Sequence, residues 1–303
     1  MTGQVRLLIS FVSSHKRGGG SLLRGICVPS AQLQTASNGR ITFRGKDMSI
    51  RPILRFAAPL PRIENYHRYL FIGPHPDDIE IGAGASAARF AAEGKEVCFL
   101  VCADGRYGTD NLDRVVSPDE LSRLRRCEAE ASAALLGVKD LRFLDFCDGG
   151  FYDPDKLTAA VAREIGDFKP DVIFAPDPDV KSECHPDHRH VGQTAKTLAL
   201  FADNPGIMAR FGTENVPVQA LALYMTADAN RYVDTSGYLD RQFAAIFDCH
   251  RSQFPSDCDA GKAVRLYLKL RAVDFGLRSL HRTAEGFRVL GRTQMHCLPE
   301  ACL

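Results

Sequence analysis

Two clusters of histidine and aspartate follow apolar runs in this sequence, and their residue types could bind a metal ion and activate water. The tetrapeptide HPDD at 75–78 follows the apolar run 69–72, and HPDH at 185–188 comes after a second run that ends at Ala175. A hydrolytic zinc site takes three imidazole or carboxylate ligands from the protein and leaves a fourth position for water. The two clusters therefore predict a metal-dependent hydrolase.

In the first cluster, His75 and Asp78 are the candidate ligands. Side chains three residues apart at the end of a strand can turn toward one ion if the backbone between them bends, and Pro76 helps to fix that bend. Asp77 then lies between the two ligands and is free to act on water. The alternative is a polar turn whose aspartate caps the following helix.

In the second cluster, His188 is the candidate third ligand, and His185 would lie near the open position. The preceding segment PDPD at 176–179 is also polar, so an exposed loop is the alternative for both histidines. Asp187 either orients an imidazole from outside the ligand set or caps the helix. Because a matching HPD sequence follows two separate apolar runs, a shared metal site is favoured over two unrelated loops.

Short apolar segments alternate with amphipathic ones from about residue 69, which predicts βαβ units. We expect an α/β fold, a three-layer Rossmann-like sandwich with a mainly parallel sheet and helices on both faces. Ligands bind such sheets at the carboxyl ends of the strands, near the reversal of strand order, and both clusters fall just beyond strand ends. The expected strands are 69–72, 96–102, 141–145, 171–175 and 220–225, and the expected helices are 82–93, 118–136, 156–168 and 191–201. Beyond Asp234 we expect only helices, at 238–250 and 260–278.

The segment GAGASA at 82–87 is a competing signal, because it resembles the glycine-rich motif of dinucleotide-binding proteins, with Asp104 at the end of the next strand. That motif should follow its strand directly, whereas here the HPDD cluster intervenes. We interpret the small residues as allowing the helix to approach the sheet closely. A nucleotide-dependent oxidoreductase is the corresponding alternative function.

Composition narrows the class of protein. The chain has 303 residues, of which 45% are hydrophobic and 25% charged, with a formal net charge of +1. These values are ordinary for a globular protein and give no electrostatic case for a nucleic acid or an anionic membrane as partner. No apolar run is long enough for a transmembrane helix. The ten cysteines are scattered without a C-x-x-C pair, which favours a reducing compartment, here the cytoplasm.

The first 46 residues contain seven Lys or Arg and no Asp or Glu. We predict two parts, a basic, acid-free, disordered extension at 1–47 and a single domain at 48–303. The alternatives for the extension are an organelle transit peptide, which would have this acid-poor composition, or upstream sequence before a start at Met48.

The sequence resembles the PIG-L/LmbE-like family of zinc-dependent N-deacetylases, which remove acetyl groups from N-acetylglucosamine conjugates. The resemblance runs roughly from His67 to Arg288 and rests on the order and spacing of several motifs. The sequence departs from the family pattern at Ile79 and Arg106, where acidic residues are common, and both positions lie near the expected rim of the site. The motifs are HPDDIEIGAG, ADGRYGTD, RRCEAEASAALLGV, LRFLDFCDGG, KPDVIFAPDPD, HPDHRHVG, CHRSQ and AEGF.

The resemblance implies a role for each site residue. Asp77 is implied to be the general base, and His185 the residue that stabilises the tetrahedral intermediate. Arg125 and Asp148 are implied to face the substrate. The ligands implied for Zn²⁺, or for another divalent metal, are His75, Asp78 and His188.

The implied activity is hydrolysis of the acetamide of an N-acetylglucosamine-type conjugate, which releases acetate and a free amino sugar. The implied partner is a small-molecule amino-sugar conjugate. A catalytically silent metal- or sugar-binding protein on the same fold is the alternative, since a fold does not fix an activity. The identity of the conjugate, the oligomeric state, with a homo-oligomer among the options, and the residue that protonates the leaving amine stay open.

Overall fold

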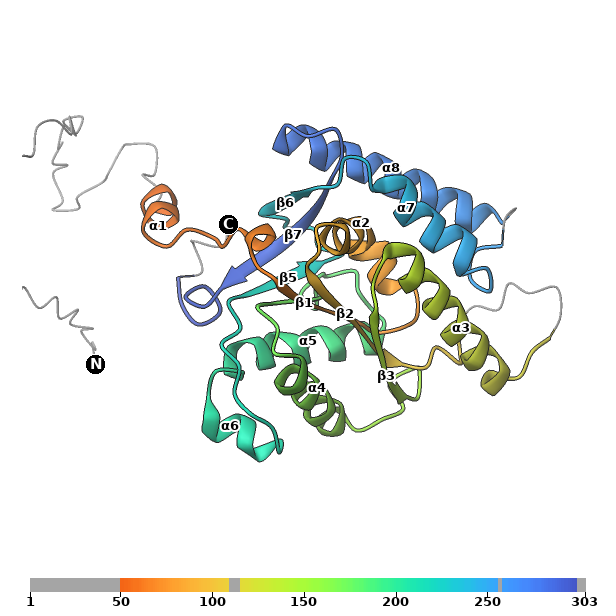
Figure 1. The fold of residues 1–303 in the computed structure, drawn as a ribbon, viewed down its shortest axis with the longest axis horizontal. Coiled ribbons are helices and arrows are strands. Elements are labelled where there is room, and N and C mark those ends of the chain that lie inside the picture. The colour runs from red at the N-terminus through yellow and green to blue at the C-terminus, as the bar shows by residue number, and fades with distance from the viewer. Residues whose placement is uncertain (1–49, 109–114, 256–257, 299–303) are drawn as a thin grey trace, which may run out of the picture. The chain divides into compact units, whose positions relative to one another are not determined.

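A seven-stranded mixed sheet forms the centre of the part of the chain that the structure describes (Figure 1). The structure is a computed structural model that describes residues 50–108, 115–255 and 258–298. The strand order is β3-β2-β1-β4-β5-β7-β6, so the order reverses between β1 and β4. Strands β1 to β5 pair with one another in parallel, whereas β7 pairs with β5 and β6 in the antiparallel direction. The strands are β1 (Arg68–Gly73), β2 (Glu96–Ala103), β3 (Asp140–Phe146), β4 (Val172–Pro176), β5 (Ala220–Tyr224), β6 (Arg231–Asp234) and β7 (Ala284–Gly291).

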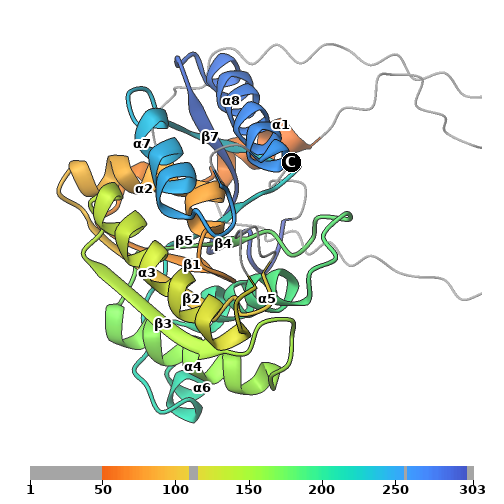
Figure 2. The same cartoon turned by 90° about the vertical axis from the view of Figure 1, so that its right-hand side faces the viewer.

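Helices cover both faces of this sheet. Figure 1 shows α2, α3, α7 and α8 on one side and α4, α5 and α6 on the other, and Figure 2 shows the same layers from the side. This arrangement confirms the predicted three-layer α/β sandwich. The helices are α1 (Arg51–Ala57), α2 (Asp78–Ala92), α3 (Pro118–Leu136), α4 (Pro154–Phe168), α5 (Pro186–Phe201), α6 (Pro205–Arg210), α7 (Leu239–Ala244) and α8 (Asp259–Ser279), with the 3-10 turn η1 (Ile63–Asn65) and the π-helical turn η2 (Ala245–Cys249).

The central strand β1 contributes to an apolar core on each face of the sheet. Side chains alternate across a strand, so Leu70 and Ile72 join the core under α4 and α5, whereas Tyr69 and Phe71 join the core under α2. Phe71 stacks on Phe174 of β4 with ring centroids 4.2 Å apart. Burying each side chain of this size contributes about 1.5–3 kcal/mol, and this packing fixes the strand ends that carry the site.

The starts of α2, α3 and α5, the helices that carry candidate site residues, can be compared with the predicted starts. Helix α3 begins and ends as predicted, because the Ser117 hydroxyl accepts the N–H of Glu120 and Gly137 adopts a left-handed conformation after the last turn. Helices α2 and α5 begin several residues before their predicted starts, at Asp78 and Pro186. The predictions followed apolar periodicity, which begins only after the polar first turns that contain the candidate ligands.

The prediction that the chain is helical beyond Asp234 is wrong for β7. This strand has nearly every residue buried, so it lacks the alternation of polar and apolar residues that marks a half-exposed strand. Its strand conformation depends on pairing with β5 and β6, for example Val289 with Ala222. Sequence periodicity alone does not reveal these two partners.

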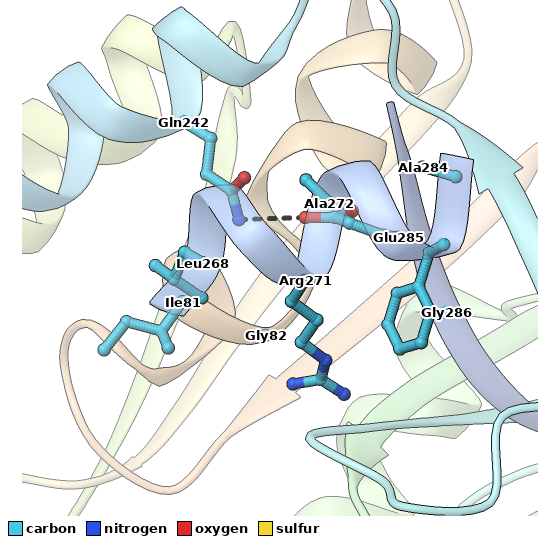
Figure 3. A pocket seen from close by; sticks show the side chains of 10 residues that line it. Ile81, Gly82, Gln242, Leu268, Arg271, Ala272, Ala284, Glu285 and Gly286 are labelled. Atoms are coloured by element: carbon cyan, nitrogen blue, oxygen red, sulfur yellow. Dashed lines mark hydrogen bonds between the residues drawn. The ribbon is translucent and has the colours of Figure 1, made fainter. Parts of the chain in front are cut away.

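Strand β7 also supplies a hydrogen-bond acceptor to helix α2. The helix bends at Ala83, which has non-helical φ/ψ, so the N–H groups of Ala85 and Ser86 begin a new helical segment. The Glu285 carboxylate of β7 accepts both, at 3.1 and 2.7 Å. Gln242 donates to the same carboxylate at 2.9 Å (Figure 3). Burial raises the pKa of Glu285 to about 7.

The glycine-rich segment lies within α2, as the close-packing interpretation expects. A Cβ added at Gly82 would come within 2.2 Å of the Tyr224 ring on β5. The glycine therefore permits a close approach of helix and sheet, and Gly82 also lines the small pocket beside Glu285 and Arg271 that Figure 3 shows.

Other features bear on the sequence predictions. The eight cysteines in the described residues are free thiols. Among the described residues, no helix has the length and apolarity needed to cross a membrane. The described residues, which begin at Ile50, form one compact unit by their contacts. The predicted extension at 1–47 and the proposed start at Met48 lie outside the described residues.

Candidate metal centre

The loops that follow four neighbouring parallel strands meet beside the reversal of strand order. The 74–77 loop follows β1, and the 177–185 loop follows β4. The 147–150 segment after β3 lies next to the 74–77 loop, because Asp148 Oδ1 is 3.1 Å from His75 Nε2. The 104–108 segment after β2 lies beside it, because Asp104 accepts the N–H of Asp148 and Asp148 accepts the N–H of Tyr107. The candidate site thus occupies the position where ligands bind in sheets of this kind.

Three predicted ligands converge on one point. The Asp78 Oδ2 atom lies 3.1 Å from Nδ1 of His75 and 3.3 Å from Nε2 of His188. Ligand atoms around a tetrahedral ion with bonds of about 2.0–2.2 Å are about 3.3 Å apart. The spacing of these three side chains therefore suits one divalent cation. An overlapping group that could also hold an ion consists of His75, Asp148, His185 and Asp187.

Carboxylates hold both imidazoles of the first group from the side away from the ligand atoms. His75 Nε2 lies 3.1 Å from Asp148 Oδ1 and 3.0 Å from Asp187 Oδ2. His188 Nδ1 lies 3.0 Å from Glu183 Oε2. Such a carboxylate fixes the proton on the outer ring nitrogen, so that the inner nitrogen presents its lone pair to a metal.

Two of these carboxylates bear on the sequence predictions. Asp187 contacts an imidazole, while the N-cap of α5 is instead His185, whose Nδ1 accepts the N–H of Asp187 at 3.3 Å. Sequence reasoning missed Glu183. The available signal was an acidic residue two positions before His185 in the same polar loop.

The electrostatics of the site favour positive charge. Burial would lower the pKa of His75, but the carboxylates of Asp148, Asp187 and Asp78 outweigh it and raise that pKa well above its ordinary value. Burial likewise opposes protonation of His188, yet Asp78 raises its pKa to about 9. The two imidazoles in turn hold the pKa of the buried Asp78 carboxyl well below its usual range. A cation can replace the protons on such imidazoles.

Asp77 lies beside this group in an unusual backbone conformation. Its φ of 120° is rare for a residue with a side chain. It occupies the N-cap position of α2, but its side chain makes no capping hydrogen bond. Its Oδ2 instead lies 3.2 Å from Nη2 of Arg125. Burial raises the pKa of Asp77 to about 6, and the Arg125 charge opposes this rise.

Arg125 is buried and joins two loops, the one after β1 and the one after β2. Its Nη2 donates to the carbonyl of Pro76 at 2.7 Å, and its Nη1 donates to the carbonyl of Gly105 at 3.0 Å. The structure thus places the guanidinium against Asp77 and backbone carbonyls. Asp148, the other residue predicted to face the substrate, contacts the His75 ring. The substrate contacts of Arg125 and Asp148 stay predictions.

His185 is the exposed member of the group, with 41% of its side-chain surface accessible. Its ring meets that of His75 edge to face, at 4.7 Å between centroids. Burial and the neighbouring His75 and His188 lower its pKa. Because its Nδ1 accepts a backbone N–H, the neutral ring carries its proton on Nε2 and can donate there.

The two departures from the family pattern have different surroundings. Ile79 is buried in the apolar core below α2. Arg106 is partly exposed and pairs with Asp104 at 2.7 Å and with Asp119 at 3.0 Å. Arg106 therefore forms ion pairs with two carboxylates at the edge of the site.

Comparison with known proteins identifies the family. The PIG-L family profile, described as GlcNAc-PI de-N-acetylase, matches residues 70–199. A diacetylchitobiose deacetylase of Thermococcus kodakarensis is 34% identical over 237 residues, which cover 77% of this chain and 87% of that protein. The chain belongs to the PIG-L family. The predicted PIG-L/LmbE-like membership is thereby confirmed.

Two further deacetylases are similar to this chain. The crystal structure of N,N'-diacetylchitobiose deacetylase from Pyrococcus horikoshii, in complex with its inhibitor MPG, has a TM-score of 0.72 and 32% identity, and the alignment covers 82% of this chain and 93% of that one. A 1D-myo-inositol 2-acetamido-2-deoxy-alpha-D-glucopyranoside deacetylase of Kineococcus radiotolerans is 28% identical, over 58% of this chain and 56% of that protein.

Proposed function

We propose that this PIG-L protein is a zinc-dependent N-deacetylase that hydrolyses the acetamide of an N-acetylglucosamine-type conjugate to acetate and a free amino sugar. The convergence of His75, Asp78 and His188 beside Asp77 carries this proposal. The relatives named above are deacetylases of acetylated amino sugars, which supports the same reaction for this chain.

The residues present fit a zinc ion. Two imidazole nitrogens and one carboxylate oxygen form a donor set that zinc commonly takes in hydrolases. We prefer this group to the overlapping one because the carboxylates of Asp148 and Asp187 already accept hydrogen bonds from Tyr107 and Gly149, in addition to their contact with His75. They are therefore placed to orient that imidazole. A bound divalent cation would acidify water and polarise the acetamide carbonyl.

Asp77 is the proposed general base. Its carboxylate accepts a proton from the attacking water, because a base with a pKa near the working pH is effective in this role. Arg125 holds the carboxylate at 3.2 Å and stabilises its charged form. The proton then passes from Asp77 to the nitrogen as the carbon–nitrogen bond breaks, which gives acetate and the amine.

His185 is the proposed oxyanion donor. Its lowered pKa keeps the ring neutral near pH 7, and the neutral ring still carries a proton on Nε2. That N–H stabilises the negative oxygen of the tetrahedral intermediate, a role for which one lost donor typically costs about 100- to 1,000-fold in rate. Leaving-group protonation is accordingly assigned to Asp77.

The test separates metal binding from proton transfer. We expect Asp77→Ala to retain zinc, measured by elemental analysis, and to lose about 100- to 10,000-fold in acetate release from N-acetylated glucosamine compounds. His188→Ala should lose the zinc itself. Asp153→Ala is a matched control, because Asp153 caps the N-terminus of α4, where its side chain accepts the N–H of Asp155.

Two outcomes would contradict the proposal. Near wild-type acetate release by Asp77→Ala would remove the general base. A wild-type protein that binds zinc but releases no acetate from any N-acetylated amino sugar would favour the catalytically silent alternative.

A further inference from the structure

Helix α8 is apolar on two opposite faces. One face packs on β6 and β7, where Leu268, Ala272 and Phe275 are buried. A helix that is apolar all round is usually buried on every side. The opposite face of α8 is nevertheless exposed, and we call its apolar residues the outward row. They are Leu266 (59% exposed), Leu270 (62%), Val273 (40%), Leu277 (73%) and, at the C-cap, Leu280 (94%).

Contacts on the inner face hold α8 in this orientation at the outer edge of its layer (Figure 1). Phe275 packs on the Tyr232 ring of β6, with centroids 5.4 Å apart. Arg271 Nη2 donates to the carbonyl of Thr226 at 3.0 Å. A rotation that buried the outward row within the same chain would break both contacts. The row is therefore a fixed surface feature that another molecule can cover.

The outward row has the spacing of a contact between two helices. From Leu266 to Leu280 its members follow one another at intervals of four, three, four and three residues. This average period of 3.5 residues is that of the a and d positions along which two helices pack. A row that occupies only these positions is a narrow seam, whereas a helix that lies on a membrane has a broader apolar face.

The charges beside the row suit a second copy of the same helix. With Leu270 at position a of the heptad, Lys269 falls at g and Asp274 at e, on opposite sides of the row. In two parallel helices, position g of one lies beside the e position five residues further along the other. Lys269 of each copy would therefore lie beside Asp274 of the other. An anionic membrane would instead be repelled by Asp274, and the net charge of +1 offers it little attraction.

The exposed area is also sufficient for a pair. The five side chains of the outward row expose roughly 600 Å² in one chain, which is at the upper end for the largest apolar patch of a monomer. Two copies would bury roughly 1,200 Å², which reaches the range of specific protein interfaces.

We infer that the outward row of α8 is the contact between two copies of this chain, which pair through parallel α8 helices about a two-fold axis. The same residues meet from both copies, as a two-fold interface requires. Each domain stays on the outer side of the pair, because α8 buries its opposite face against its own sheet. This inference is independent of the proposed deacetylase function, since the row contains none of the site residues.

The first test is the oligomeric state of the full chain, measured by sedimentation velocity from about 1 to 100 µM. We expect a reversible dimer of the wild type. Leu270→Asp should raise the dimer Kd by at least about 30-fold, because it places a charge at the centre of the contact. Circular dichroism of the monomers checks that the variant is folded. Leu135→Asp is the matched control, because Leu135 is an exposed leucine of α3 that lies outside the row, and it should keep the wild-type Kd.

The second test is a charge swap. Lys269→Glu and Asp274→Lys should each raise the dimer Kd by about 3- to 10-fold, because each places like charges side by side twice in the pair. The double variant Lys269→Glu/Asp274→Lys should return to within about twofold of the wild type. This recovery is specific to the parallel arrangement, because antiparallel helices do not bring positions g and e together.

Several outcomes would overturn the inference. A wild-type chain that stays monomeric over the whole concentration range would exclude the pair, as would equal effects of Leu270→Asp and Leu135→Asp. A dimer that the double variant does not restore would exclude the parallel arrangement. Flotation of the monomeric wild type with vesicles of phosphatidylcholine and phosphatidylserine, lost in Leu270→Asp, would assign the row to a membrane surface instead.

Discussion

Glu183 offers a sharp test of how the metal centre is held, because its carboxylate contacts a proposed ligand without belonging to the ligand set. Its Oε2 lies 3.0 Å from His188 Nδ1, and its Oε1 accepts the N–H of His185 at 2.8 Å. Glu183→Ala removes both contacts. The His188 ring can then rotate or place its proton on Nε2, the nitrogen that faces Asp78, so metal affinity should fall.

The size of the loss follows from the burial of the pair. Loss of a carboxylate that orients a metal-bound histidine typically costs about 10- to 100-fold in metal affinity. Glu183 and His188 have side chains that are 24% and 15% exposed, so water screens the contact only in part. We therefore expect about tenfold for Glu183→Ala, which is about 1.4 kcal/mol. Glu183→Gln keeps a neutral acceptor for the Nδ1 proton and should lose only about threefold.

The assay is competition for zinc with a chromophoric chelator, at fixed pH and ionic strength. Glu214→Ala is a matched control, because Glu214 pairs with Lys169 at the surface and its side chain is 77% exposed. Wild-type zinc affinity in Glu183→Ala would refute the orienting role. A loss of the same size in Glu214→Ala would show that the effect is not specific to the site.

Two further predictions concern the stability of the helices and strands that position the site. The native pKa of Glu285, raised to about 7, exceeds its value of 4.5 in a model peptide, so the folded protein holds this proton more tightly than the unfolded chain does and the associated stability is lost as pH rises through 7. Between pH 5 and 8, urea unfolding should therefore show the wild type losing about 2–3 kcal/mol relative to Glu285→Gln, and parallel pH profiles for the two proteins would contradict the prediction. Gly192→Ala should destabilise the protein by about 1–3 kcal/mol, because a Cβ there would lie 2.6 Å from the carbonyl oxygen of Pro176 at the end of β4. Gly206→Ala, whose Cβ would meet nothing closer than 3.4 Å, is the control in the same unfolding assay, and equal effects of the two substitutions would count against the close contact.

The sequence determined the fold class and the main site segments because their signals are local. Apolar runs that alternate with amphipathic ones specify parallel strands and covering helices, and the carboxyl ends of such strands lie on one edge of the sheet. The two HPD clusters follow two of these runs, so their meeting could be predicted without coordinates. Helix α3 was bounded correctly because its caps, Ser117 and Gly137, are specific residue types.

Only the tertiary structure decided how the ligands are supported and where the chain pairs at long range. Strand β7 is buried almost throughout, so it carries no alternating pattern, and its strand state depends on pairing with β5 and β6. The contact of Arg125 with Asp77 joins residues 48 positions apart, and that of Asp187 with His75 joins residues 112 positions apart. Such contacts depend on how four loops meet above the sheet, which local propensity and periodicity do not encode.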